Sequence, residues 1–187
     1  MDDPSVPRPR TLPPGVARLA EALARRRVPL GFVAAAVTLL FAQPTWTSWR
    51  AGLVIAFAGQ SLRVWATGHL EKGREVTRSG PYRFLRHPLY AGSIVIAIGA
   101  AAASRSVVVT AVAALYMGLT ISAAIRLEEA RLRQAFGSTY DDYAASRAAP
   151  MERRFSLARA VRNREYRAIG GLILGFALLA LKILTPL

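Results

Sequence analysis

The sequence contains no cysteine and only two histidines among its 187 residues. The missing thiols exclude disulfide bonds, thiolate metal sites and a cysteine nucleophile. With His69 and His87 as the only imidazoles, a metal centre built from histidines is not expected either. Lysine is also scarce, with 2 residues against 23 arginines, a bias that is typical of GC-rich bacterial genomes.

Charge is scarce overall, because charged residues make up 19% of the chain and hydrophobic ones 53%. The charge that is present is mostly positive and gives a net charge of +14. A soluble nucleic-acid-binding protein carries such charge over its whole surface and keeps its apolar residues in short stripes. Here the apolar residues form long blocks with the charges between them, which excludes a nucleic-acid partner and predicts a membrane protein.

Five apolar blocks divide the chain into candidate membrane helices. A bilayer core about 30 Å thick needs about 17–25 helical residues. The chain shows no strand pattern. A soluble helical bundle would need polar helix faces, which Ile94–Ala103 and Val107–Leu119 lack. We therefore expect an all-α integral membrane protein whose single membrane domain covers residues 28–187. The expected transmembrane helices are Val28–Ala42, Ala51–Gly68, Leu89–Ala103, Val107–Ile125 and Ile169–Leu184.

The basic residues lie on alternate connections between these blocks. Six precede the first block, five lie between the second and third, and ten lie between the fourth and fifth, so 21 of 25 are on one side. Cytoplasmic loops carry such an excess of Lys and Arg. The pattern predicts a bacterial inner-membrane protein with a cytoplasmic amino terminus and an external carboxyl terminus.

Two basic segments are expected to meet the cytoplasmic membrane surface. Residues 1–14 are rich in proline and are predicted to be disordered. Gly15–Arg27 has the pattern of a short amphipathic helix lying on the membrane. Met151–Arg167 has six arginines against two glutamates, and we expect it to lie on anionic lipid headgroups.

The connection Ser104-Arg105-Ser106 is barely long enough for a turn, so the third and fourth blocks form a tight hairpin. A hairpin brings the residues before its first helix close to the residues after its second helix. Two polar segments, 80–92 and 126–129, are thereby expected to meet at the cytoplasmic membrane surface. Their chemically versatile side chains are Tyr82, Arg86, His87, Tyr90, Arg126, Glu128 and Glu129.

Each of these features also has a purely structural explanation. Pro88 can begin a helix at its first turn, which would leave His87 as an ordinary residue before a helix. Glu129 and Arg133 form a favourable i, i+4 pair on a solvated helix face. Arg63 either extends to the cytoplasmic interface or has a partner or ligand, because an arginine at that depth costs about 2–3 kcal/mol.

The combined pattern is more specific than its parts. Arg-His-Pro-Leu-Tyr-Ala-Gly at 86–92 is followed by the hairpin, by Arg-Leu-Glu-Glu at 126–129 and by Phe-Gly-Ser-Thr-Tyr-Asp-Asp-Tyr at 136–143. This order resembles the isoprenylcysteine carboxyl methyltransferase family, within the broader superfamily that includes phospholipid N-methyltransferases. The chain matches the family pattern RHPxYxG, hairpin, EExxL and FGxxYxxY throughout. The resemblance covers about residues 60–150.

The resemblance implies an integral membrane methyltransferase that uses S-adenosylmethionine in a pocket on the cytoplasmic side. It implies that His87 and Tyr90 line the cofactor site and that Glu128 and Glu129 hold the methionine portion. Catalytic contacts to a carboxylate or to the substrate are implied for Arg86 and Arg126, and His87 would accept a proton if the acceptor is an amine. The tyrosines that would complete or close the pocket are Tyr82, Tyr140 and Tyr143.

The sequence leaves several alternatives open. The fifth block shields the active site, forms a homodimer contact through Gly170, Gly171 and Gly175, or serves only as an anchor. The acceptor is expected to be a lipophilic small molecule or lipid, methylated at a carboxylate or an amine. A membrane reductase related to sterol reductases would instead bind NADPH, with Arg131 or Arg133 on its 2′-phosphate. A non-catalytic membrane subunit is the third reading.

Overall fold

The computed structural model describes residues 14–185, and every regular element in that range is helical. The all-α class is therefore confirmed for this part of the chain. The disorder predicted for residues 1–14 lies outside the described residues except at Pro14, which is the first residue of α1. The elements are α1 (Pro14–Phe41), α2 (Trp46–His69), the 3₁₀ helix η1 (Gly80–Arg83), α3 (Pro88–Ser104), α4 (Val107–Phe136), α5 (Ser138–Ala144), α6 (Leu157–Arg162) and α7 (Tyr166–Leu184).

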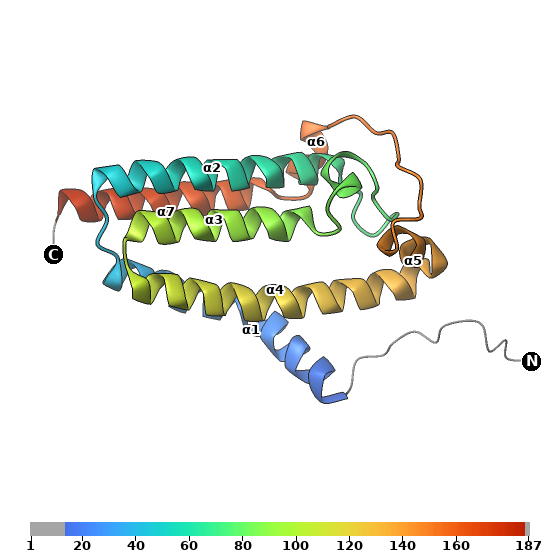
Figure 1. Cartoon of the computed structure of the whole chain (residues 1–187), viewed down its shortest axis with the longest axis horizontal. Helices are drawn as coiled ribbons and strands as arrows, with labels where there is room; N and C mark the ends of the chain where they lie inside the picture. Colours follow the sequence, from blue (N-terminus) through green and yellow to red (C-terminus); the bar gives the residue numbers. More distant parts are fainter. Residues whose placement is uncertain (1–13, 186–187) are drawn as a thin grey trace, which may run out of the picture.

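The long helices run alongside one another, while the short ones gather at a single end of the bundle (Figure 1). The helix α2 packs chiefly against α3, and α1 packs chiefly against α4. The α3–α4 connection joins these two pairs, and α7 lies against α2 with smaller contacts to α1 and α3. We call the end with η1, α5 and α6 the polar end. The expected helix Gly15–Arg27 is the first part of α1, whose initial turns point away from α4 in Figure 1.

The tight hairpin between α3 and α4 is confirmed. Helix α3 ends at Ser104 and α4 begins at Val107. Between them Arg105 has φ 51° and ψ 27°, a left-handed conformation that is uncommon for a residue other than glycine. The hydroxyl of Ser106 then accepts a hydrogen bond from the backbone N–H of Val109 at 3.4 Å, which caps α4. The turn fixes the two helices antiparallel.

Among the described residues, two helices are long and apolar enough to cross a membrane, namely α4 and α7. Only 17% and 11% of their apolar windows are buried, unlike the enclosed core helix of a soluble domain. The apolar helices Pro29–Phe41, within α1, and Pro88–Ser104 are shorter. Of the five predicted spans, those in α4 and α7 are supported by length and composition. The spans in α1, α2 and α3 remain predictions.

Large apolar side chains face outward along several helices. A soluble monomer rarely exposes so much contiguous apolar surface, whereas a lipid-facing bundle requires it. Examples are Phe32 on α1, Phe57 on α2, Leu115 on α4 and Ile173 on α7, each more than half exposed.

Glycines allow α2 and α3 to approach each other closely. A Cβ atom added to Gly59 would lie 2.7 Å from the carbonyl oxygen of Gly92, and one added to Gly92 would lie 2.7 Å from the carbonyl oxygen of Gly59. Gly52, seven residues before Gly59, and Gly99, seven residues after Gly92, face each other in the same way. Small residues at such contacts let helix backbones pack together, and here they set the position at which α3 begins.

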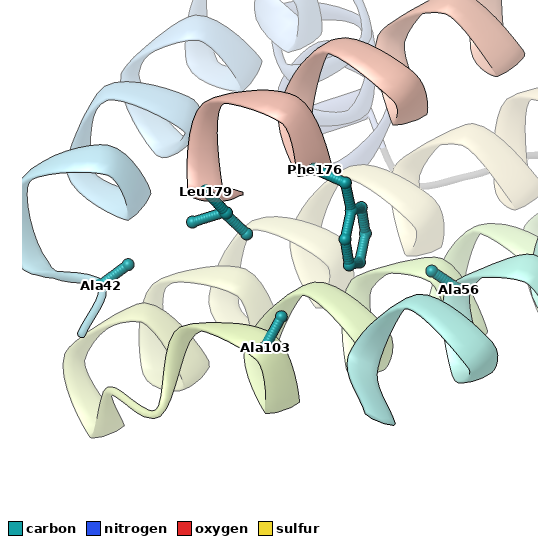
Figure 2. Close-up of a cluster of buried hydrophobic side chains, with 5 residues drawn as sticks. All are labelled: Ala42, Ala56, Ala103, Phe176 and Leu179. Atoms are coloured by element: carbon teal, nitrogen blue, oxygen red, sulfur yellow. The ribbon is translucent and has the colours of Figure 1, made fainter. Parts of the chain in front are cut away.

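At the end opposite the polar end, α7 is packed into the bundle rather than attached at its edge. A buried apolar cluster joins α7 to the other helices there (Figure 2). The indole Nε1–H of Trp49 donates to the carbonyl of Phe176 at 2.8 Å, and the ammonium of Lys182 donates to the carbonyl of Leu40 at 3.0 Å. The cluster consists of Ala42, Ala56, Ala103, Phe176 and Leu179. The glycine face of α7 has open space around it, so the homodimer contact stays a prediction.

At the polar end, ion pairs fasten the basic segment before α7 to the loop after α2. Arg153 pairs with Glu75 through contacts of 2.6 and 2.8 Å, and Arg159 pairs with Glu71 at 2.8 Å. Three of the six arginines in residues 151–167 thus have carboxylate partners within the chain, because Arg162 also contacts Glu71. Binding of this segment to lipid headgroups remains a prediction. The arginines of the segment that have no carboxylate partner in the described residues would make these contacts.

His69 lies beneath this network at the end of α2. Its side chain is buried, and Nδ1 lies 3.2 Å from the hydroxyl of Ser79. Burial lowers the pKa of His69 below its ordinary value of 6.5, and the positive charges of Arg159, Arg153 and Arg83 lower it further. This histidine therefore serves as a neutral structural group.

Candidate functional site

The loop before α3 delivers His87 to the polar end of the bundle. His87 is the residue before the helix, and the buried Pro88 is the first residue of α3. Proline is favoured there because its fixed φ suits the first turn and its missing N–H has no helical partner. The structural explanation for Pro88 is confirmed, and it places the imidazole directly above the first turn of α3.

Helix α4 continues well beyond the predicted end of its apolar block. The predicted span stops at Ile125, whereas α4 runs to Phe136, roughly 16 Å further at 1.5 Å per residue. The extension carries the Arg-Leu-Glu-Glu segment and projects it past the start of the neighbouring α3. The polar residues after the span are therefore held on a rigid helix rather than on a loop.

Glu129 is the centre of the side-chain cluster that we call the Glu129 cluster. Its carboxylate lies 3.3 Å from Nε2 of His87, 3.3 Å from a guanidinium nitrogen of Arg133 and 4.0 Å from one of Arg86. The rings of His87 and Tyr90 are 5.8 Å apart. The structure thus brings together the two segments that the hairpin was expected to join, although 42 residues separate His87 from Glu129.

The neighbouring Glu128 and Arg126 are placed differently. Both side chains are exposed, and neither forms an ion pair within residues 14–185. They lie on the same helix as Glu129 but take part in none of its ion pairs. Their predicted roles toward a cofactor or substrate remain predictions, and both groups are available to a ligand from the solvent side.

Arg133 links the Glu129 cluster to α5. Its guanidinium contacts Asp141 at 3.2 Å and lies over the ring of Tyr140, 5.4 Å from the centroid. Such an arrangement adds cation–π attraction to the ion pairs. The expected i, i+4 contact between Glu129 and Arg133 is confirmed, but the link through Arg133 to Asp141 was missed. The FGxxYxxY spacing gave no sign of it, because it depends on the bend between α4 and α5.

Tyr140 is almost completely buried, with 1% exposure, and its hydroxyl has no hydrogen-bond partner among the described residues. Burial, reinforced by the negative charge of Glu129, raises the pKa of Tyr140 to about 12. Buried hydroxyl groups normally have a partner. The unpaired hydroxyl beside the Glu129 cluster is therefore a polar group that a bound ligand would satisfy.

Tyr143 closes the cluster from the carboxyl-terminal side. Its hydroxyl donates to the backbone carbonyl of Tyr82 at 2.9 Å, so α5 is fastened to η1. Burial raises the pKa of Tyr143 to about 12 and also raises the pKa of the enclosed Tyr82. Both hydroxyls stay protonated near neutral pH, and they act here as hydrogen-bonding and packing groups.

Arg63 has a partner within the chain. Its guanidinium contacts the carboxylate of Glu165, the residue before α7, at 2.9 and 3.0 Å. A further donor reaches the hydroxyl of Ser93 on α3 at 2.6 Å, and the side-chain amide of Gln60 donates to Glu165 at 2.7 Å. Of the two explanations given for Arg63, a partner is the one that the structure bears out. The pair ties α7 to α2 and to the beginning of α3.

An apolar groove of about 350 Å³ lies between α3 and α4. Ile94 and Ser122 line its nearest part, and each lies seven residues, about two helical turns, from His87 and Glu129 respectively. Small residues on both helices leave this space open. Other lining residues are Ala97, Ile98, Ala114 and Gly118.

Comparison with known proteins gives a family match that covers the α3–α4 hairpin and the Glu129 cluster. A family model described as phospholipid methyltransferase matches residues 32–139, which include the α3–α4 hairpin and the Glu129 cluster. The chain is 36% identical over 119 residues to the cobalt-zinc-cadmium resistance protein CzcN of Cupriavidus metallidurans, covering 59% of this chain and 54% of that protein. No solved structure matches.

Two further relatives show the same partial coverage. The nickel-cobalt-cadmium resistance protein NccN of Alcaligenes xylosoxydans is 35% identical over 95 residues, 50% of this chain and 43% of that protein. A probable protein-S-isoprenylcysteine O-methyltransferase of Oryza sativa is 33% identical over 92 residues, 49% of this chain and 48% of that protein. The chain spans about half the length of the curated relatives that it matches.

Proposed function

Because the chain belongs to the phospholipid methyltransferase family, we propose that it is an integral membrane enzyme that transfers a methyl group from S-adenosylmethionine to a lipophilic carboxylate or amine. The observation that carries this proposal is the 3.3 Å contact between His87 and Glu129. It assembles an imidazole and a carboxylate from two helices of one hairpin, next to an apolar groove.

The charges of the side chains fit the cofactor. S-adenosylmethionine carries an ammonium and a sulfonium, and carboxylates attract such cations more strongly where the dielectric is reduced. Glu129 is 21% exposed and Glu128 is open to solvent beside it, so the pair offers one enclosed and one accessible carboxylate. The buried hydroxyl of Tyr140 offers an unused hydrogen bond. The residues that we assign to the cofactor are His87, Tyr90, Glu128, Glu129, Tyr82 and Tyr140.

When bound, S-adenosylmethionine would supply a methyl group on a positively charged sulfur, which leaves as a neutral thioether when the acceptor takes the methyl group in line; no metal is needed for this. The main task of the chain is then to hold the acceptor in alignment. A carboxylate acceptor needs no proton transfer, and Arg86 and Arg126 would attract it. With an amine acceptor, Nδ1 of His87 takes the proton while Nε2 faces Glu129, whose negative charge stabilises the resulting imidazolium.

The groove between α3 and α4 supports a lipophilic acceptor. It is lined almost entirely by apolar side chains of α3 and α4, which suit the apolar part of a lipid. An apolar chain in the groove would direct its reactive head toward His87, two turns away. The proposed enzyme thus receives its acceptor from the bilayer and its cofactor from the cytoplasm.

The reductase alternative is less well supported by the same residues. Arg133 was one of two arginines expected to bind the 2′-phosphate of NADPH, but it is engaged by Glu129 and Asp141. An arginine held by two carboxylates is a poor ligand for a further anion, because their negative charges oppose it. Of the two arginines, only Arg131 is left to bind such a phosphate.

Equilibrium binding of S-adenosylhomocysteine to the detergent-purified protein tests the proposal, with NADPH as the comparison ligand. We expect saturable binding of S-adenosylhomocysteine, weakened at least about tenfold by Glu129→Gln, because a hydrogen bond to a charged group is worth about 1.5–3 kcal/mol. Asp142→Asn is the matched control, since Asp142 is a half-exposed carboxylate on α5 whose one ion pair among the described residues is with Arg147.

The other outcomes of this binding experiment would each support a different function. Binding of NADPH alone would place it with the reductases, and binding of neither ligand would favour the non-catalytic subunit. Equal affinities in the wild type and in a well-folded Glu129→Gln variant would remove the cofactor role of this carboxylate.

A further inference from the structure

A separate cavity lies at the polar end of the bundle, between η1 and the chain that follows α5. Its volume is about 400 Å³, and it is lined by Arg83, Glu152, Arg153 and Arg154, none of which belongs to the Glu129 cluster. A guanidinium N–H of Arg83 donates to the carbonyl of Met151 at 3.1 Å. This bond joins the two walls of the cavity, so the arginines of both walls are held in one place.

The cavity keeps a net positive charge. The guanidinium of Arg153 is neutralised by Glu75. Arg83 and Arg154 form no ion pair within residues 14–185, and the same is true of Glu152, the one carboxylate in the lining. Two guanidinium groups therefore retain free N–H donors with only one opposing charge. Such planar donors match the oxygen atoms of a phosphate group.

The loop before η1 contains a further arginine, Arg78, with an unsatisfied donor. Nε of Arg78 is buried and has no hydrogen-bond partner among the described residues. The same residue is joined to the cavity wall, because its carbonyl accepts from the backbone N–H of Met151 at 3.3 Å. A buried N–H without a partner is uncommon, and its positive charge adds to the attraction for an anion nearby.

Exposed apolar side chains stand next to these arginines in the sequence. Phe84 and Leu85 follow Arg83 and are 79% and 44% exposed, and Phe155 follows Arg154 and is 47% exposed. A free phosphate ion would gain nothing from them. A lipid offers both an anionic phosphate and an apolar portion, so the pairing of arginines with exposed apolar residues favours a lipid.

We propose that this cavity binds the phosphate group of an anionic membrane lipid. Arg83 and Arg154 donate to the phosphate oxygens, while Phe84, Leu85 and Phe155 contact the glycerol and acyl region beside it. Arginines at the cytoplasmic surface attract anionic lipids in this way. The site stands apart from the proposed methyl transfer and does not depend on it.

Native mass spectrometry of the detergent-purified full chain, titrated with phosphatidylglycerol, tests this site. We expect the double variant Arg83→Gln, Arg154→Gln to bind phosphatidylglycerol about tenfold or more weakly, because two charge-assisted contacts are lost. Arg167→Gln is the matched control, since Arg167 is an exposed arginine without an ion pair in the described residues; its affinity should stay within about twofold. Equal weakening in both would reduce the effect to general charge and overturn the site.

A second variant keeps the proposal testable if the double variant does not fold. Glu152→Gln removes the opposing charge and should strengthen lipid binding by about two- to fivefold; an unchanged affinity would contradict the proposal. Glycerol 3-phosphate distinguishes the two sources of phosphate, because binding as tight as that of the lipid would show a site for a soluble anion instead. Binding of S-adenosylhomocysteine, measured in parallel, reports the proposed enzyme separately.

Discussion

At the scale of single residues, the pair of Arg63 and Glu165 joins parts of the chain that are 102 residues apart. Glu165 is 4% exposed, and its carboxylate also accepts from Gln60. We expect Glu165→Gln to lower the free energy of unfolding by about 3 kcal/mol, because it leaves the guanidinium of Arg63 without its counter-charge. Unfolding by a denaturing detergent, followed by circular dichroism, measures the change.

Asp142→Asn is again the control for this prediction. The pair of Asp142 with Arg147 is half-exposed, at 50% and 65%, and such pairs contribute about 0–1 kcal/mol. The double variant Arg63→Met, Glu165→Leu should recover part of the lost stability, since it removes both charges together. A loss in Glu165→Gln as small as that in Asp142→Asn would contradict a stabilising role.

His69 makes the stability of the fold depend on pH. Because its pKa lies below 6.5 in the folded protein, the unfolded chain binds a proton below that pH that the folded chain does not. The free energy of unfolding should therefore fall as the pH drops below about 6.5 and recover as the pH rises. Melting temperatures between about pH 5 and 8 measure this slope, and His69→Gln should flatten it.

Glu71 acts in the same direction at lower pH. The hydrogen bond from Arg159 holds the pKa of Glu71 below 4.5, so its stabilising contact is complete above that value and is lost as the pH falls further. This second decline should persist in His69→Gln. A wild-type protein whose melting temperature rose on acidification from about pH 7 to 5.5 would contradict the assignment of His69.

The sequence could indicate which two segments meet, but not which side chains of those segments make the contacts. The hairpin predicted that His87 would approach the glutamates, and His87 does contact Glu129. Whether Glu128 or Glu129 faces α3 depends on the rotation of α4 about its axis, which no local pattern specifies. The partner of Arg63 was equally out of reach, because it requires α7 to fold back beside α2.

At the scale of helices, the close contact between α2 and α3 positions the first turn of α3. We expect Gly59→Ala to lower the free energy of unfolding by about 1–3 kcal/mol, because the added Cβ would lie 2.7 Å from the carbonyl oxygen of Gly92 and overpack the contact. Moving α3 also moves His87, so binding of S-adenosylhomocysteine should weaken in the same variant.

Gly171→Ala is the matched control on α7. A Cβ atom there meets nothing within 4 Å, and alanine favours a helix by up to about 1 kcal/mol over glycine. The control should therefore be neutral or stabilising in detergent. If both variants melted together at the wild-type temperature, the α2–α3 contact would be looser than the structure indicates.

The long helices were predictable because apolar blocks and turn residues mark them. Pro88 marks the start of α3, and the short Ser104-Arg105-Ser106 connection marks the hairpin. The extension of α4 to Phe136 and the short helices α5 and α6 were not predicted, because these segments are short or interrupted by charged residues and no long apolar period identifies them. Their positions follow from long-range contacts such as that between Tyr143 and Tyr82.

At the scale of the whole molecule, the distribution of arginines predicts which end of the bundle faces the cytoplasm. The chain lacks cysteine, so single cysteines can report this directly. We expect Arg105→Cys, in the hairpin turn, to react with a membrane-impermeant maleimide in intact cells. Arg74→Cys, in the loop after α2, should react only after the cells are opened, because the positive-inside pattern places it in the cytoplasm.

The reverse labelling pattern would invert the topology and place the Glu129 cluster outside the cell, away from cytoplasmic S-adenosylmethionine. Labelling of both positions in intact cells would indicate that the bundle does not span the membrane. Both positions are exposed, so a failure to label opened cells would show poor expression rather than burial.

The Glu129 cluster and the tyrosines around it come from one hairpin and its flanks, within residues 82–143. A gene segment that encodes this stretch therefore transmits the complete set of polar groups in one piece. Recombination can join it to different surrounding helices and so change what reaches the groove, without rebuilding the polar cluster. Relatives formed in this way would share the middle of their chains and diverge at both ends, and they would inherit a common reaction while acquiring separate biological roles.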